Sequence, residues 1–561
     1  MRWTARKLLF IFFLLASIAG TALADTDLAL NGVSAPPPEA AADIRRRHSA
    51  LAQNRSQSVD YRMSEVRTAI LVVGFGIFAW GFFIPAHRPK KIVRARLFLL
   101  TVAAGAAFAS YYQFFQFSHV RGFATTDNFH YYVGSKYFDE LGYFDLYSCS
   151  LVVLAERGLQ LPNSQSDRVR NLRSMELQPY ETIKETGRNC PLRFGAERWQ
   201  AFGDDVAFFV QKWPDHLRRA TWKDHGYHPS PSWTLAGGWV ANIFSVSNPE
   251  SAYLLSRVDR LLIISAFATV AWIFGLETTC LIVLIWGTGC LWRYAWVGDA
   301  FFRHLWWISA IGGVAALKRG LPLIGGAALS CATLLRLFPG ALGLGYGLRA
   351  AQHLLVHRGL KARHKRFMGG AALAFGSIGL ASLMVLPSSA YSDFVIKISE
   401  FSSMTITNQI GVQVLAQWLS PQASWVALSI HISILIAFFA LFWRALRETE
   451  DWEAAALGAC LIPLVTAPTN YYFSFFIVVA LLASRRPTVG LVLLGAATAW
   501  NLNGLIFYQE YDEYRWASVI AVAASFLVVV EVIRGKLNTG LAQENPDVSS
   551  TKFRSQAPIS G

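Results

Sequence analysis

The sequence predicts an all-α polytopic membrane protein with about 13 transmembrane helices after a signal peptide, and three observations favour this fold class. Of the 561 residues, 53% are hydrophobic and only 16% are charged, whereas a soluble domain carries about 25% charged residues. The apolar residues form long runs. The cations gather in short loops between those runs, which is the pattern of the positive-inside rule. This composition excludes a disordered chain, a collagen and an ordinary cytosolic enzyme.

Residues 1–24 are expected to form a signal peptide. Cations precede a short apolar stretch, and Ala22-Leu23-Ala24 matches an A-x-A cleavage site. An uncleaved first helix is the alternative. In both cases residues 25–64, which are polar and rich in Pro and Arg, are expected to form a flexible outer leader.

Apolar runs follow along the chain, and each is expected to be a span, although several are shorter than the roughly 20 residues that cross a bilayer. The runs are 66–86, 97–117, 254–275, 277–292, 304–317, 321–337, 340–356, 367–387, 424–445, 454–468, 471–484, 489–507 and 516–533. Residues 65–117 thus hold two spans, 253–535 the remaining bundle and 536–561 a cytoplasmic tail. The basic loops, such as 87–96 and 358–366, then lie inside, as expected for a multi-pass inner-membrane protein.

The large loop 118–252 lies outside in this topology, and its many aromatic residues predict a folded unit with interfacial helices. Cys149 and Cys190 are its only cysteines. Two cysteines in an oxidising compartment predict a disulfide, which would contribute roughly 3–4 kcal/mol in the chain-entropy model. Two free thiols are the alternative.

A polar and aromatic stretch after the second span provides the first group of candidate site residues. Asp127 lies soon after the membrane exit, and helix N-capping is the alternative role for its carboxylate. The residues after it suggest an amphipathic helix on the membrane surface that ends near Gly142. Its lipid-facing side chains would be Phe129, Tyr132, Tyr137 and Leu141. Its candidate substrate-binding residues are His130, Tyr131, Tyr132 and Lys136.

A second polar cluster precedes the next span and contains His225, Tyr227 and His228. A His-x-x-His spacing beside Asp224 is compatible with a metal, but no further acidic residue is spaced to complete a ligand set. Hydrogen bonding to a sugar or phosphate fits better, and a structural turn is the alternative. No metal site is therefore predicted.

Two further clusters contain the cations that could bind an anion. Arg293, Asp299 and Arg303 lie in a short outer loop, where an ion pair between Asp299 and Arg303 at i, i+4 is the structural alternative. Arg336 lies at the outer end of a span. A lone Arg there usually faces a cavity or an anion, although its side chain could also snorkel to the interface.

All four clusters are expected on the outer face, where a carboxylate, cations and aromatic rings suit a polar head group on a lipid. Cations would neutralise a phosphate, and the carboxylate would accept a proton from a hydroxyl. No nucleotide-binding glycine motif appears, so the donor is not expected to be a soluble nucleotide sugar. The net charge of +15 is spread over short loops, so no nucleic-acid partner is expected.

These stretches resemble the GT-C class of integral-membrane glycosyltransferases, most closely the GT87 (DUF2029) family that uses polyprenyl-phosphate mannose. An Asp after an early span, a Tyr-Tyr pair, a Gly and a Leu-Tyr pair occur in order. Tyr227-x-Pro229-x-Pro231, a Gly298-Asp299 loop, Arg336 to Pro339 and Pro468 to Tyr472 resemble later family motifs. The chain departs from the family at Asp299 and Phe301, where Gln and Asn are usual, and at Arg336, where Lys is usual.

The resemblance implies an inverting transfer from a polyprenyl-phosphate sugar to a lipid or glycan acceptor. Asp127 would be the general base, and Arg336, Arg293 or Arg303 would hold the leaving phosphate. No metal or other cofactor is implied. The expected partners are membrane lipids, the lipid-linked donor and the acceptor, and the sequence indicates neither the sugar nor the oligomeric state.

Two other functions remain open on the sequence. One is a transporter or flippase for a lipid-linked or anionic solute, which midplane charges and internal repeats would mark. The other is a non-catalytic assembly protein that binds a partner through the aromatic loop. The charged clusters at one face and the lack of a visible repeat favour the enzyme.

Overall fold

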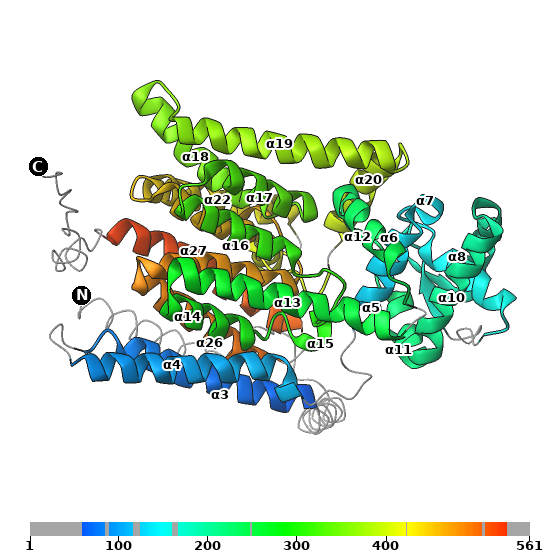
Figure 1. The fold of residues 1–561 in the computed structure, drawn as a ribbon, viewed down its shortest axis with the longest axis horizontal. Coiled ribbons are helices and arrows are strands. Elements are labelled where there is room, and N and C mark those ends of the chain that lie inside the picture. The colour runs from blue at the N-terminus through cyan, green and yellow to red at the C-terminus, as the bar shows by residue number, and fades with distance from the viewer. Residues whose placement is uncertain are drawn as a thin grey trace, which may run out of the picture.

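The computed structural model describes residues 59–84, 89–115, 124–159, 167–246, 249–404, 406–421, 423–507 and 511–535. The predicted signal peptide, most of the leader 25–64 and the tail 536–561 lie outside these residues. The described chain forms a bundle of long, roughly parallel helices with a smaller helical unit at one end (Figure 1). We call this unit, residues 124–246, the end domain.

The bundle is built from helical elements that precede and follow the end domain. They are α3 (Val59–Trp80), α4 (Lys90–Tyr111), α13 (Pro249–Phe274), α14 (Leu276–Gly287), α16 (Leu305–Lys318), α17 (Pro322–Leu335), α18 (Gly340–His357), α19 (Ala362–Val385), α22 (Ser424–Leu446), α23 (Asp451–Gly458), η5 (Ala459–Leu461), α24 (Ile462–Val465), η6 (Asn470–Phe475), α25 (Phe476–Val479), η7 (Ala480–Ser484), α26 (Pro487–Ile506) and α27 (Tyr511–Arg534). Shorter elements, η1 (Gln113–Phe115), α15 (Tyr294–Val297), α20 (Ala390–Ser403) and α21 (Val412–Leu419), connect them.

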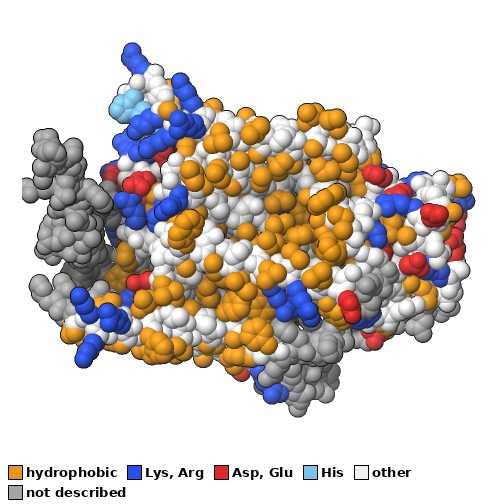
Figure 2. Space-filling view, in the orientation of Figure 1, with side chains coloured by type: hydrophobic (Ala, Val, Ile, Leu, Met, Phe, Trp, Pro, Cys, Tyr) orange, Lys and Arg blue, Asp and Glu red, His pale blue; other side chains and the backbone are white. Residues whose placement is uncertain are grey.

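Among the described residues, 6 helices are long and apolar enough to cross a membrane, namely those in α3, α4, α19, α22, α26 and α27. Hydrophobic side chains cover the visible face of the bundle, and charged ones gather toward its two ends (Figure 2). The chain is therefore a helical protein with the surface of a membrane protein. The other predicted runs contain shorter or interrupted helices. In the run near 454–468, Pro463 lacks the N–H that a continuous helix needs, and the chain passes from α23 through η5 to α24.

Helix α3 begins at Val59, so residues 59–64 are helical, although they were predicted to belong to the flexible leader. The Tyr61 hydroxyl donates to the carbonyl of Leu505 at 3.3 Å, which ties this first turn to the end of α26. A tertiary contact of this kind does not show in the apolar pattern of the first span.

The end domain is a set of short helices with one two-stranded sheet. Its elements are α5 (Thr125–Asn128), η2 (Phe129–Val133), α6 (Gly134–Lys136), α7 (Phe138–Leu141), α8 (Leu146–Glu156), β1 (Arg168–Arg170), β2 (Leu177–Pro179), α9 (Tyr180–Thr186), η3 (Cys190–Arg193), α10 (Ala196–Lys212), α11 (Pro214–Arg219), η4 (Thr221–Lys223) and α12 (Pro231–Ile243). Strands β1 and β2 are antiparallel. Cys149 on α8 and Cys190 on η3 form a disulfide, as predicted.

The end domain has its own aromatic core, which corrects the predicted surface helix. Phe129, Tyr132, Tyr137 and Leu141 are at most 1% exposed, so none of them faces lipid. Helix α10 covers this segment, with Phe209 against Phe129 and Phe202 against Tyr137. The aromatic residues that suggested a membrane surface are therefore core residues. The predicted end near Gly142 is confirmed, because α7 ends at Leu141 and Gly142 has a φ of 54°.

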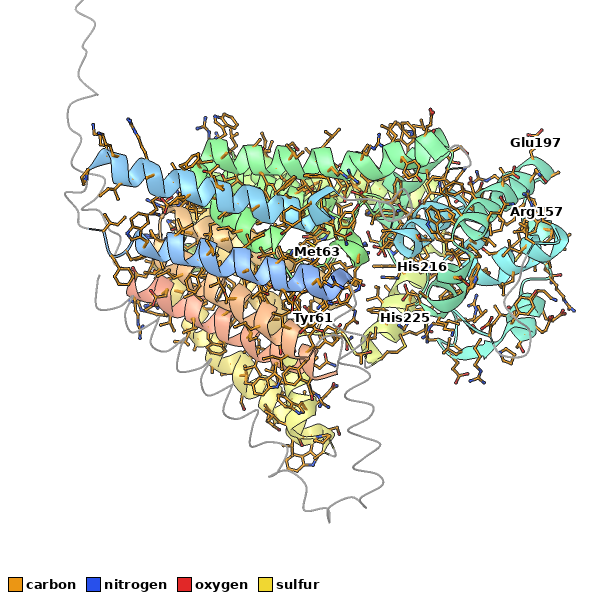
Figure 3. All side chains as sticks on the ribbon, turned by 90° about the horizontal axis from the view of Figure 1, so that it is seen from below. Tyr61, Met63, Arg157, Glu197, His216 and His225 are labelled. Carbon is orange, nitrogen blue, oxygen red and sulfur yellow. A yellow bond between two sulfur atoms is a disulfide. The ribbon has the colours of Figure 1, made fainter. Side chains whose placement is uncertain are left out.

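Helix α20 connects the bundle to the end domain. It follows α19 in sequence, and Ala390 and Phe394 on it belong to the aromatic core of the end domain. Its Lys397 is fully buried and donates to the carbonyl of Leu172 at 2.7 Å. Two parts of the chain that are distant in sequence thus meet where the bundle ends, in the region where Figure 3 shows His225 and His216.

Candidate functional site

Asp127 lies in the first turn of helix α5, at the border between the end domain and the bundle. The N-cap of α5 is Ala124, and no side chain caps this helix, so the alternative role of Asp127 as a capping residue is wrong. Its side chain is 17% exposed. A carboxylate in the first turn still benefits from the helix dipole, and its oxygens remain available for other contacts.

The loop after α15 brings Arg303 to this carboxylate. Asn128, the neighbour of Asp127, donates to the carbonyl of Asp299 at 3.2 Å and accepts from the backbone N–H of Phe301 at 3.0 Å. This double contact attaches the loop to α5. Arg303 Nη1 then lies 3.1 Å from Asp127 Oδ2, and the Arg303 side chain is 5% exposed.

Arg336 reaches the same place from the end of helix α17. The helix ends at Leu335, and Arg336 adopts an extended conformation. Its Nη2 donates to the Tyr131 hydroxyl at 2.8 Å, and Arg303 Nη1 donates to that same hydroxyl at 3.1 Å. Two guanidinium groups therefore converge on one phenol, and Arg336 points into the site rather than snorkelling to the membrane interface.

Two tyrosines from late in the chain form one wall of this site. The Arg303 guanidinium lies 4.4 Å from the ring centre of Tyr471 and 5.2 Å from that of Tyr472. Arg336 lies 5.7 Å from the Tyr472 ring. The sequence placed these tyrosines in a late motif without assigning them a role. Only their aromatic doublet after Pro468 could have drawn attention to them.

The charges of the site leave a positive excess. Asp127 faces Arg303 and Arg336, so one carboxylate opposes two guanidinium groups. Burial raises the pKa of the Asp127 carboxyl above its usual range, and the Arg303 guanidinium opposes that rise. Burial also lowers the pKa of the His228 imidazole well below its usual range, and Arg336 lowers it further. His228 is therefore neutral at pH 7, and the two arginines supply the charge that can attract an anion.

The histidines predicted as site residues line the end-domain side of the site. His130 is 1% exposed, and its Nε2 lies 2.7 Å from the Tyr147 hydroxyl while its Nδ1 lies 3.6 Å from Asp224. The imidazole of His228 stacks on Phe401 of α20 at 5.3 Å, and His225 meets the edge of the same ring. Among the described residues, no group of three His, Cys, Asp or Glu side chains is placed to hold a metal ion.

Three predicted substrate-binding residues instead form internal contacts of the end domain. Lys136 Nζ forms an ion pair with Asp205 at 2.7 Å. The Tyr132 hydroxyl donates to the carbonyl of Phe244 at 2.8 Å. Tyr227 is fully buried, with its hydroxyl 2.7 Å from that of Thr234. These contacts lie within the folded unit and do not join the arginine pair.

The remaining two predicted residues bond elsewhere in the bundle. Asp299 accepts from Arg260 Nε at 2.7 Å and from the Tyr294 hydroxyl at 2.5 Å, so the alternative of an i, i+4 ion pair with Arg303 is wrong. The turn around Asp299, which has a φ of 54°, directs the two side chains to different partners. Arg293 is fully buried and pairs with Glu513 of α27 at 3.0 Å.

The fold and these contacts define a helical membrane-type protein with a cationic, aromatic site where its bundle meets an end domain. Searches against protein-family models, curated proteins and solved structures found no match to this chain.

Proposed function

We propose that this chain is an integral-membrane glycosyltransferase that moves a sugar from a polyprenyl-phosphate donor to a hydroxyl of a lipid or glycan acceptor. The observation that carries the proposal is the convergence of Asp127, Arg303 and Arg336 around the Tyr131 hydroxyl. This group lies where an apolar bundle meets a polar domain. Such a place suits a reaction between a phosphate on a long apolar chain and a hydroxyl in the aqueous phase.

The two arginines would bind the donor phosphate. A sugar phosphodiester carries one negative charge, and one carboxylate opposite two guanidinium groups leaves one positive charge to balance it. Arginine is well suited to this role because its planar fork can donate two parallel hydrogen bonds to phosphate oxygens. Positive charge held in place by Tyr131 and the tyrosine wall would also stabilise the phosphate as it leaves.

Asp127 would then act as the general base. Arg303 forms an ion pair with Asp127, and a bound phosphate would compete for that guanidinium and release the carboxylate. The acceptor oxygen forms a bond to the anomeric carbon, and the bond from that carbon to the phosphate oxygen breaks with its electron pair. The acceptor proton passes to Asp127, and the anomeric configuration inverts through an oxocarbenium-like state.

The proposed topology has 13 spans after the signal peptide, with 118–252 outside and the tail inside the inner membrane. The cation-rich loops support this orientation, and the 6 long apolar helices are compatible with it. The site would then lie at the outer face, where a lipid-linked donor presents its sugar.

A transfer assay in proteoliposomes tests the proposal. The purified chain would be supplied with labelled polyprenyl-phosphate sugars and a panel of lipid and glycan acceptors. We expect labelled product with the wild type and at least about 100-fold slower transfer with Asp127→Asn. Movement of intact donor across the bilayer, with no new glycosidic bond for any donor, would favour the transporter alternative instead.

A further inference from the structure

A strongly basic hairpin lies at the end of the bundle opposite the end domain. It is formed by the last turns of α18, a short turn and the first turn of α19 (Figure 1). Residues 349–366 contain 6 Lys or Arg and 3 His, and no Asp or Glu. Figure 2 shows Lys, Arg and His side chains gathered at this end of the molecule.

Little negative charge from elsewhere reaches this hairpin. Among the described residues, the one carboxylate ion-paired with it is Asp451, which lies 2.7 Å from Arg363 Nε and 3.7 Å from His364 Nε2. His364 is 2% exposed, and its Nδ1 is buried without a hydrogen-bond partner. The side chains of Lys361, Lys365 and Arg366 are exposed. The hairpin therefore holds a large surplus of positive charge around a buried imidazole nitrogen.

Exposed apolar side chains lie on the same hairpin as these cations. Leu355 and Val356, in the last turn of α18, are 71% and 74% exposed. His353 and His357 sit on the same turn, with ring centres 4.3 Å apart. In water, exposed Leu and Val next to clustered cations would be unfavourable. At a membrane surface, the apolar residues can enter the acyl boundary while the cations meet headgroups.

We propose that the 349–366 hairpin is a binding site for anionic phospholipids, with Lys361, Lys365 and Arg366 holding the headgroup phosphate. Charge complementarity selects an anionic over a zwitterionic lipid, and Leu355 and Val356 select a lipid over a soluble phosphate. The site lies at the opposite end of the bundle from Asp127, so it is independent of the proposed transferase reaction.

Native mass spectrometry of the full chain in a non-ionic detergent tests this site. Phosphatidylglycerol and phosphatidylcholine would be titrated onto wild type, onto a Lys361→Gln, Lys365→Gln, Arg366→Gln variant, and onto a matched Lys90→Gln, Lys91→Gln, Arg94→Gln variant. The matched variant removes the same two Lys and one Arg from exposed positions at the start of α4. Thermal unfolding would check that both variants fold.

We expect wild type and the α4 variant to bind phosphatidylglycerol similarly, and the hairpin variant to bind it about 100-fold more weakly. The three lost cations contribute to binding at an anionic surface, and the loss of their binding free energy corresponds to about that change in affinity. Equal losses in both variants would mean generic attraction to basic loops and would overturn the proposal. Equal affinity for phosphatidylcholine would also overturn the proposal. Complete displacement of the lipid by millimolar glycerol phosphate would overturn it too, because that result would indicate a site for soluble anions.

Discussion

Asp127 Oδ2 lies 3.1 Å from Arg303 Nη1, and this ion pair joins the end domain to the loop that follows α15. Both side chains are mostly buried, at 17% and 5% exposed. Taking two charges out of water costs several kcal/mol per ion, and a pair of this kind adds little net stability. Its position beside a second arginine is therefore better explained by chemistry than by folding.

The substitution Asp127→Asn tests the base directly. The amide keeps the size of the side chain but cannot accept a proton, so we expect transfer to fall by about 10²–10⁴-fold. The donor should still bind, because Arg303 and Arg336 remain, whereas loss of the buried ion pair with Arg303 should lower the melting temperature. Asp204→Asn is the matched control, because Asp204 is an exposed acid of the same domain paired with Arg157. Near wild-type transfer by Asp127→Asn would contradict the role of this carboxylate. Asp299 would be a poor alternative candidate for the general base, because its carboxylate already accepts a hydrogen bond from Arg260.

Arg336→Ala should weaken donor binding, measured by titration of a polyprenyl-phosphate sugar onto purified protein. Removing a charged partner of a bound phosphate typically costs about 2–5 kcal/mol. Arg336→Lys should restore part of that loss as a point charge without the bidentate fork. The exposed Arg188, which pairs with Glu185, provides an alanine control in the end domain. Unchanged donor affinity in Arg336→Ala would leave this arginine a structural role only.

Loss of the Cys149–Cys190 disulfide should destabilise the end domain. The bridge spans a sequence separation of 41, for which the chain-entropy model gives about 4 kcal/mol. We expect the double Cys→Ser variant to unfold at a lower temperature than wild type under oxidising conditions. Peptide mapping without reduction should recover the linked peptides. Two alkylatable thiols in freshly purified protein would show that the bridge does not form.

Labelling of single cysteines in intact cells tests the topology. Lys361→Cys should resist a membrane-impermeant maleimide, because 358–366 holds five cations in nine residues and is expected inside. Glu185→Cys, on helix α9 of the end domain, should react with it. Labelling of position 361 from outside would contradict the orientation of the whole chain.

Lys397 should make the stability of the end domain depend on pH. Burial lowers the pKa of its ammonium from 10.5 to about 7. Between these values the unfolded chain binds a proton that the folded chain does not, so the free energy of unfolding rises with pH, by at most about 1.4 kcal/mol per pH unit. Lys397→Met should flatten this rise between pH 7 and about 10 and stabilise the protein below pH 7. Lys184→Met serves as control, because Lys184 is only partly buried and pairs with Glu181, and equal slopes in wild type and Lys397→Met would disprove the effect.

Much of the architecture could be read from the sequence, because it depends on local composition. Apolar runs between basic loops predict helices whatever their neighbours are, and each predicted run among the described residues contains helical structure. The pairing of Cys149 with Cys190 could be predicted because the end domain offers no other cysteine. The membership of Asp127, Arg303 and Arg336 in one polar group was likewise expected from their shared position near one face.

The contacts within that group were decided by the tertiary structure. Sequence spacing suggested Arg303 as the partner of Asp299, but Asn128 holds the loop so that Arg303 meets Asp127 and Asp299 meets Arg260. Periodicity suggested that Phe129 and Tyr137 face lipid, but α10 covers them, and a pattern cannot tell one apolar environment from another. Tyr471 joins the site from far along the chain. Local patterns thus determine which segments are helical and apolar, whereas the choice of partner depends on how distant segments pack.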